Sequence, residues 1–216
     1  MLQIFAKNIL NLLPYSIRSR IRTLIGKVQL RNWKNNGSPA PPPHYLKQQI
    51  IKYYQSKYNI KTFIETGTSY GDMIEAQKKT FDRLYSIELG KDIWKKAVKR
   101  FRHDANVTIL QGDSGKVLET VTSDLNEPAI FWLDGHYSGG ITARGEKECP
   151  ILEEVNAIFR FKNIDHILLV DDASSFDGQH DYPTIDELTT HIKTKNNKYE
   201  VTIKDDIVRY IVAAKE

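Results

Sequence analysis

The sequence has little cysteine and no long apolar run. Cys149 is its only cysteine among 216 residues, so the chain cannot form an internal disulfide or a cysteine-based zinc site. This favours a reducing compartment, and we expect the protein to be cytoplasmic. No apolar run reaches the roughly 18 residues that a membrane-spanning helix needs, and the first 22 residues lack the apolar core and cleavage site of a secretory signal.

Acidic residues are absent from the first 64 positions. That stretch holds eleven Lys and Arg, whereas the rest of the chain has twenty basic residues against 27 acidic ones. Apolar residues in 1–34 fall mostly at helical spacing, with a break near Pro14, which predicts a basic amphipathic helical arm. Such an arm suits peripheral contact with an anionic inner membrane face or an acidic partner, and it also suits a homodimer or packing on the domain. Nucleic acid is not expected, because the remainder of the chain is acidic.

A proline-rich linker is predicted at residues 35–44, where Gly37 and four prolines prevent a continuous helix. Residues 45–216 then alternate between helical and strand patterns, which predicts one α/β domain with a parallel sheet. Helices are expected near 45–57, 71–80, 91–102, 114–122, 150–161 and 184–194, and strands near 61–65, 83–88, 106–110, 129–133 and 166–170. Two β-rich runs around Lys204 to Asp206 predict a closing hairpin.

A glycine-rich turn follows the first predicted strand, in TFIETGTSYGDMIEAQ. Glycines at a strand-to-helix turn let the backbone approach a ligand, and the helix N-terminus adds hydrogen-bond donors. Glu88 ends the second strand 23 residues after Glu65, where dinucleotide-binding folds place the acid that holds ribose hydroxyls. Asp113 follows the third strand on the same expected edge. Ordinary α/β proteins also use such turns, so the acids at the strand ends, more than the turn, indicate a nucleotide-like ligand.

The motif ETGTSYG, with Glu88 and Asp113, resembles the class I S-adenosylmethionine-dependent methyltransferases from about Thr62 to the final hairpin. The resemblance implies a Rossmann-like α/β fold with a mostly parallel seven-stranded sheet, a C-terminal antiparallel hairpin and helices on both faces. It implies S-adenosylmethionine as cofactor, and Ser69 stands where the family has its middle glycine. The cofactor-binding residues that it implies are Glu65, Gly67, Thr68, Ser69, Gly71, Asp72, Glu88, Asp113, Ser114 and Asp134.

Three aspartates follow the fourth and fifth predicted strands: Asp134, Asp171 and Asp172. Crowded carboxylates suit a hard divalent cation such as magnesium. Alternatively, Asp134 orients the cofactor while the Asp171 and Asp172 pair caps the next helix. The arrangement is similar to that of metal-dependent O-methyltransferases of the catechol type and of those that modify macrolides or sugars, in which the cation holds the acceptor hydroxyl.

The resemblance leads to a hypothesis of methyl transfer to a hydroxyl of a sugar, glycan or other small molecule. His136 is the candidate base, acting with Asp134 as the catalytic residues, and Tyr137, His180, Asp181 and Tyr182 are expected on the acceptor side. The chain also resembles bacterial methyltransferase-like proteins associated with polysaccharide biosynthesis. Two alternatives stay open: a metal-independent O- or N-methyltransferase, and a non-catalytic protein that binds nucleotide-like ligands and docks through its basic arm.

Overall fold

The computed structural model describes residues 15–135 and 147–213. The chain divides into two compact units, residues 1–50 and residues 51–216. The helices are α2 (Tyr15–Asn35), α3 (His44–Tyr58), α4 (Asp72–Gln77), α5 (Lys91–Phe101), α6 (Ser114–Thr122), α7 (Ile151–Phe159) and α8 (Ile185–Lys195), with the 3-10 helix η1 (Ala173–Ser175). The strands are β1 (Thr62–Thr66), β2 (Arg83–Glu88), β3 (Val107–Gln111), β4 (Ala129–Leu133), β5 (Ile167–Val170), β6 (Glu200–Lys204) and β7 (Ile207–Ile211).

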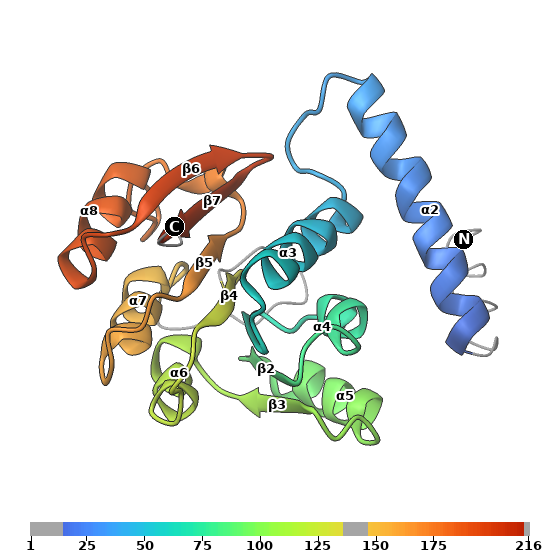
Figure 1. Ribbon diagram of the computed structural model, residues 1–216, viewed down its shortest axis with the longest axis horizontal. Coiled ribbons are helices and arrows are strands. Elements are labelled where there is room, and N and C mark those ends of the chain that lie inside the picture. The colour runs from blue at the N-terminus through green and yellow to red at the C-terminus, as the bar shows by residue number, and fades with distance from the viewer. Residues whose placement is uncertain (1–14, 136–146, 214–216) are drawn as a thin grey trace. The chain divides into compact units, whose positions relative to one another are not determined.

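The second unit is built on one seven-stranded sheet in the order β3-β2-β1-β4-β5-β7-β6. β1 to β5 pair in parallel, and β7 pairs antiparallel with both β5 and β6. Figure 1 shows α4 and α5 on one side of the sheet and α6, α7 and α8 on the other. The predicted doubly covered α/β sheet and closing hairpin are confirmed.

The central strands owe their position to uninterrupted apolar sequence. β4 reads AIFWL and β5 reads ILLV, and every residue of both strands is buried. Strands covered by helices on both faces need such continuous apolar runs, because neither face meets water. At the closing hairpin, Asp205 and Asp206 both have left-handed φ angles, near 56°, a conformation that aspartate tolerates better than most residues.

The predicted helix at 71–80 ends earlier than expected, since α4 stops at Gln77. The backbone N–H of Thr80 donates to the Gln77 carbonyl at 2.7 Å, which tightens the last turn. This turn carries Phe81 into the core, where its ring lies 5.2 Å from that of Phe63. The other helices and strands predicted between residues 45 and 213 agree with the structure to within two residues.

The first unit contains α2 and the start of α3. α2 begins at Tyr15, and the part of the predicted arm before it, residues 1–14, lies outside the described residues. The indole Nε1 of Trp33 donates to the carbonyl of Pro39 at 2.6 Å, which ties the end of the helix to the proline-rich segment. Among the described residues, no helix is both long and apolar enough to cross a membrane.

His166 should make the stability of the fold depend on pH. The residue is 1% exposed, and its Nδ1 accepts a hydrogen bond from the N–H of Ala129 at 3.1 Å, which requires an unprotonated nitrogen. Burial lowers the pKa of His166 from 6.5 to about 4. Below pH 6.5 His166 becomes protonated in the unfolded chain but stays neutral in the native state. The unfolding free energy therefore falls by about 3 kcal/mol between pH 6.5 and pH 4.

Urea unfolding between pH 4 and pH 7.5 measures this effect. His166→Asn is the matched variant, because its side-chain carbonyl can accept the same hydrogen bond without titrating. We expect the wild type to lose about 1.4 kcal/mol more per pH unit than this variant in the window. Equal slopes would show that the histidine is not the titrating group.

Candidate active site

The predicted site lies where the strand order of the sheet reverses. β1 has β2 on one side and β4 on the other, and these strands are parallel. In open α/β sheets the crevice beyond the carboxyl ends of the strands at this reversal is the usual ligand site. The turns after β1, β2, β4 and β5 all leave this edge.

The turn after β1 runs through three left-handed residues. Gly67, Ser69 and Gly71 have φ angles of 82°, 48° and 72°. Ser69 therefore has a left-handed conformation that favours glycine, at a cost of about 1 kcal/mol for a residue with a side chain. A Cβ on Gly67 would lie 2.2 Å from the backbone oxygen of Asp134, so only glycine lets the turn pass this close to the end of β4.

Glu88 closes the turn from the neighbouring strand. The carboxylate accepts hydrogen bonds from the backbone N–H of Ser69 at 2.9 Å and from that of Gly90 at 2.8 Å. The residue is 6% exposed. Two backbone donors thus fix this carboxylate at the strand end, and its predicted role toward ribose hydroxyls stays a prediction.

Beneath the turn, three side chains from β1, β2 and the turn itself form a buried hydrogen-bonded row. Ser86 Oγ donates to Glu65 Oε2 at 2.6 Å and lies 2.7 Å from the Thr68 hydroxyl. With the Ser86 proton directed at Glu65, Thr68 is the donor to Ser86. Burial raises the pKa of the Glu65 carboxyl well above its ordinary value, and the negative charges of Asp134 and Glu88 add to this. Bringing a cation close would favour its ionised form.

Two of the expected cofactor residues have structural partners. Asp113 is the N-cap of α6, and its side chain accepts from the Gly115 N–H at 3.0 Å. Asp72 forms an ion pair with Arg100 at 2.9 Å across α4 and α5. Ser114 is buried, and its Oγ would lie 3.0 Å from a Cβ on Gly135. Their roles toward a cofactor stay predictions.

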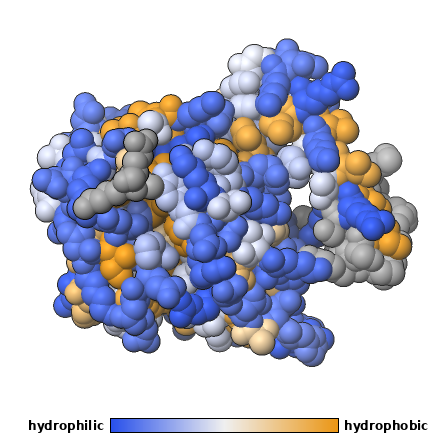
Figure 2. All heavy atoms as spheres, viewed as in Figure 1, coloured by the Kyte–Doolittle hydropathy of each residue, from blue (hydrophilic) through white to orange (hydrophobic). Residues whose placement is uncertain are grey.

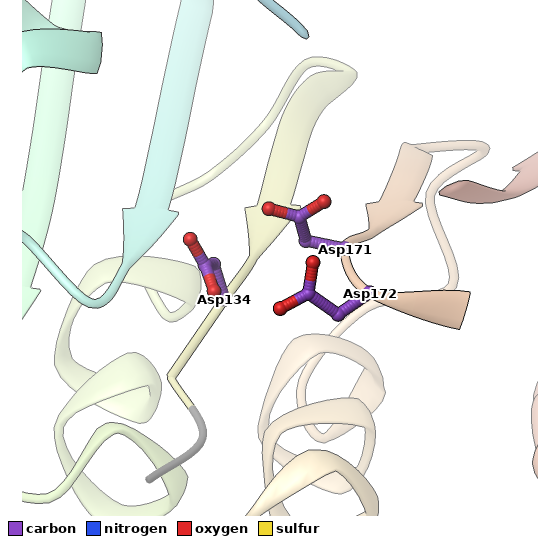
Figure 3. Close-up of side chains that lie close together, drawn as sticks. All are labelled: Asp134, Asp171 and Asp172. Carbon is purple, nitrogen blue, oxygen red and sulfur yellow. The ribbon is translucent and has the colours of Figure 1, made fainter. Parts of the chain in front are cut away.

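The three aspartates that follow β4 and β5 converge. Figure 3 shows the carboxylates of Asp134, Asp171 and Asp172 turned toward one another, one from the end of β4 and two from the end of β5. One carboxylate oxygen from each lies within 4.8 Å of the others, and among the described residues this trio is the group of side chains that could hold a metal ion. Asp171 is 2% exposed, whereas the other two are half-buried.

Backbone contacts hold this trio in place. The N–H of Asp134 donates to Thr66 Oγ1 at 3.1 Å, and the N–H of Asp171 donates to the Leu133 carbonyl at 3.1 Å. Asp172 has a left-handed φ of 52°. Two residues later, the N–H of Ser174 donates to Oδ1 of the hairpin residue Asp206 at 2.8 Å. The β6–β7 turn therefore holds the backbone that follows the aspartate pair.

The residues expected on the acceptor side separate into two groups. Tyr182 is half-buried, and its ring meets that of Phe176 edge-on at 5.5 Å. Burial raises the pKa of the Tyr182 phenol, and the negative charges of Asp172 and Asp134 contribute. His180 and Asp181 are exposed in left-handed conformations. The other two expected site residues, His136 and Tyr137, lie outside the described residues.

Sequence reasoning missed Ser86 and Asp206. Ser86 is a polar residue within a buried strand, two positions before Glu88, and this irregularity was the available signal. Asp206 carried no signal beyond a hairpin turn, because its partner Ser174 is 32 residues away. Cys149 is buried, and burial raises the pKa of its thiol to about 12, so it is not a nucleophile at neutral pH.

The fold is shared with solved methyltransferases. An O-methyltransferase from Bacillus cereus in complex with S-adenosylhomocysteine matches with a TM-score of 0.57 at 11% identity, over 88% of this chain and 90% of that one. The O-methyltransferase TomG of tomaymycin synthesis from Streptomyces achromogenes, in complex with S-adenosylmethionine, matches with a TM-score of 0.53 at 12% identity, over 87% and 89%. A methyltransferase from Podospora anserina, bound to S-adenosylhomocysteine, matches with a TM-score of 0.52 at 12% identity, over 94% and 99%.

No protein-family model and no curated protein matches the sequence. The likeness to the solved structures is therefore one of fold. The chain has the Rossmann-like fold of the class I S-adenosylmethionine-dependent methyltransferases, as predicted.

Proposed function

We propose that the protein is an S-adenosylmethionine-dependent O-methyltransferase that uses a divalent cation, with Mg²⁺ as the first candidate, to bind a hydroxyl acceptor. The observation that carries the proposal is the convergence of Asp134, Asp171 and Asp172 within 4.8 Å, beside the turn that approaches Asp134 through Gly67. In this proposal the cation site and the cofactor-binding turn, Gly67 to Gly71, share one edge of the sheet.

The donor set fits a hard cation. Mg²⁺ and Ca²⁺ bind oxygen at about 2.0–2.6 Å, so two oxygens on the same ion lie at most about 4–5 Å apart. The spread of 4.8 Å in the trio requires only small side-chain movements. A bound divalent cation lowers the pKa of a hydroxyl that it contacts.

The chain's own residues would hold the cofactor around the same edge. Backbone between Gly67 and Gly71 would lie along the methionine part, and the Glu88 carboxylate would accept from the ribose hydroxyls, as the fold's usual binding mode requires. The Glu65 carboxylate beneath the turn would attract the positively charged end of the cofactor's methionine part. Asp113 and Ser114, at the start of α6, would flank the adenine.

In the proposed reaction the acceptor oxygen forms a bond to the methyl carbon while the carbon–sulfur bond of the sulfonium breaks. The electron pair of that bond stays on sulfur, which gives S-adenosylhomocysteine, and the hydroxyl proton passes to a base. His136 remains the candidate base. The acceptor class, a sugar, glycan or other hydroxylated molecule, rests on the sequence resemblance.

Calorimetric titration tests both halves of the proposal. S-adenosylmethionine should bind one site per chain, with or without a chelator, because the Gly67 turn and Glu88 do not need the cation. Mg²⁺ should bind one further site in chelator-free protein. Absence of cofactor binding would refute the methyltransferase proposal, whereas cofactor binding without Mg²⁺ binding would favour the metal-independent O- or N-methyltransferase.

A further inference from the structure

α2 carries a row of exposed apolar side chains. Ile17, Leu24, Ile25 and Val28 are 46%, 63%, 49% and 59% exposed. Residues four and seven positions apart lie on the same side of a helix, so Ile17, Leu24 and Val28 share one face. Figure 2 shows apolar side chains along this helix. We call these four residues the apolar row.

The opposite side of α2 already has a neighbour within the first unit. A Cβ on Gly26 would lie 2.6 Å from ring atoms of Tyr45, so the tyrosine ring lies directly against the helix there. Gly26 is two positions from both Leu24 and Val28, which places it about 160° around the helix axis from each of them. Ile17, Leu24 and Val28 therefore face away from the side of α2 that contacts Tyr45.

Positive charge borders the apolar row. Arg20, Lys27 and Arg31 are exposed, and at 100° per residue they lie along one flank of it. α2 contains no acidic residue, and neither does the rest of the chain before Glu65. A protein surface that matched this helix would have to be both apolar and uniformly acidic, whereas an anionic phospholipid surface offers both properties everywhere.

We propose that α2 binds the surface of an anionic phospholipid membrane, lying in its plane with the apolar row inserted among the acyl chains and the basic flank at the headgroups. At about 31 Å, the 21-residue helix is long enough to lie along the interface. This inference does not depend on the proposed enzymatic activity.

Flotation of the full-length protein with vesicles tests the proposal. Vesicles of phosphatidylcholine alone are compared with vesicles containing about one-third phosphatidylglycerol. We expect binding to the anionic vesicles at low salt, at least about tenfold weaker binding to the neutral ones, and release as the salt concentration rises.

Two sets of substitutions separate the apolar and basic parts. Leu24→Gln with Val28→Gln should weaken vesicle binding at least about tenfold. Arg20→Gln, Lys27→Gln and Arg31→Gln together should weaken it on the order of a hundredfold. The matched control removes three exposed lysines from α5, by Lys95→Gln, Lys96→Gln and Lys99→Gln, and should bind almost as tightly as the wild type.

Three results would overturn the proposal. The first is a wild-type protein that ignores anionic vesicles at low salt. The second is a Leu24 and Val28 variant that binds as tightly as the α5 control. The third is a wild-type protein that is a dimer by light scattering, a Leu24 and Val28 variant that is a monomer, and no vesicle binding by either protein. If the variant fails to fold by circular dichroism, the wild-type comparison of lipids and salt decides.

Discussion

Asp171→Asn is expected to abolish the response of the protein to divalent cations. Asparagine keeps the shape of the side chain but removes a charge that is 2% exposed and lies in the carboxylate trio. Mg²⁺ affinity should fall at least about a hundredfold, since even outer-shell changes around a metal site cost 10- to 100-fold. Calorimetry measures the affinity, and S-adenosylmethionine binding should remain within about threefold of the wild type.

Thermal unfolding gives a second view of the same variant. Without a cation, the asparagine variant should be at least as stable as the wild type, because the substitution relieves repulsion between like charges. Saturating Mg²⁺ should stabilise the wild type by about 3 kcal/mol, equivalent to about 6–10 °C in Tm, and leave the variant unchanged. Asp92→Asn removes a carboxylate that is 90% exposed on α5 and should behave as the wild type. A variant that keeps the full Mg²⁺ response would end the cation proposal.

Gly67→Ala is expected to disrupt the proposed cofactor-binding turn, Gly67 to Gly71. Its Cβ would lie 2.2 Å from the backbone oxygen of Asp134, and the residue has a φ of 82°. Backbone at the end of β4 cannot yield as a flexible side chain can, so β1 and β4 would have to separate at this edge. We expect a loss of at least about 3 kcal/mol in unfolding free energy and at least about a tenfold loss of S-adenosylmethionine affinity. Urea unfolding and calorimetry measure the two effects.

Gly178→Ala is the matched control for the glycine experiment. Gly178 has nearly the same φ, 83°, but its Cβ would meet only the methyl group of Thr184, at 3.2 Å. This substitution should cost about 1–2 kcal/mol and leave cofactor affinity unchanged. Similar losses for both variants would mean that left-handed strain, and not the close approach to β4, makes glycine necessary at position 67.

Much of the fold could be predicted because each element has a local signature. The apolar runs of β4 and β5 and the helical spacing between the strands depend on neighbours in sequence, and their bounds were predicted to within two residues. The predicted end of α4 was wrong, because the burial of Phe81 against Phe63 ends the helix. That contact joins residues 18 positions apart, and local periodicity does not report it.

Only part of the candidate site could be predicted from the sequence. Rules for parallel sheets place Glu88, Asp134 and Asp171 at one edge without any coordinates. They do not say that Ser69 keeps a glycine-like backbone, or that Asp113 is occupied as the N-cap of α6. They also give no hint that Asp206 supports the loop after Asp172.

The amino-acid sequence alone predicts an α/β domain, a glycine-rich turn and a series of acids at strand ends. It also shows an N-terminal segment without negative charge. Those features are set by short-range spacing and by composition. Only the folded chain decides which carboxylates meet, since the 4.8 Å trio joins positions 37 residues apart through the pairing of β4 with β5. Side-chain distances across a sheet follow from register and packing, which depend on every strand at once.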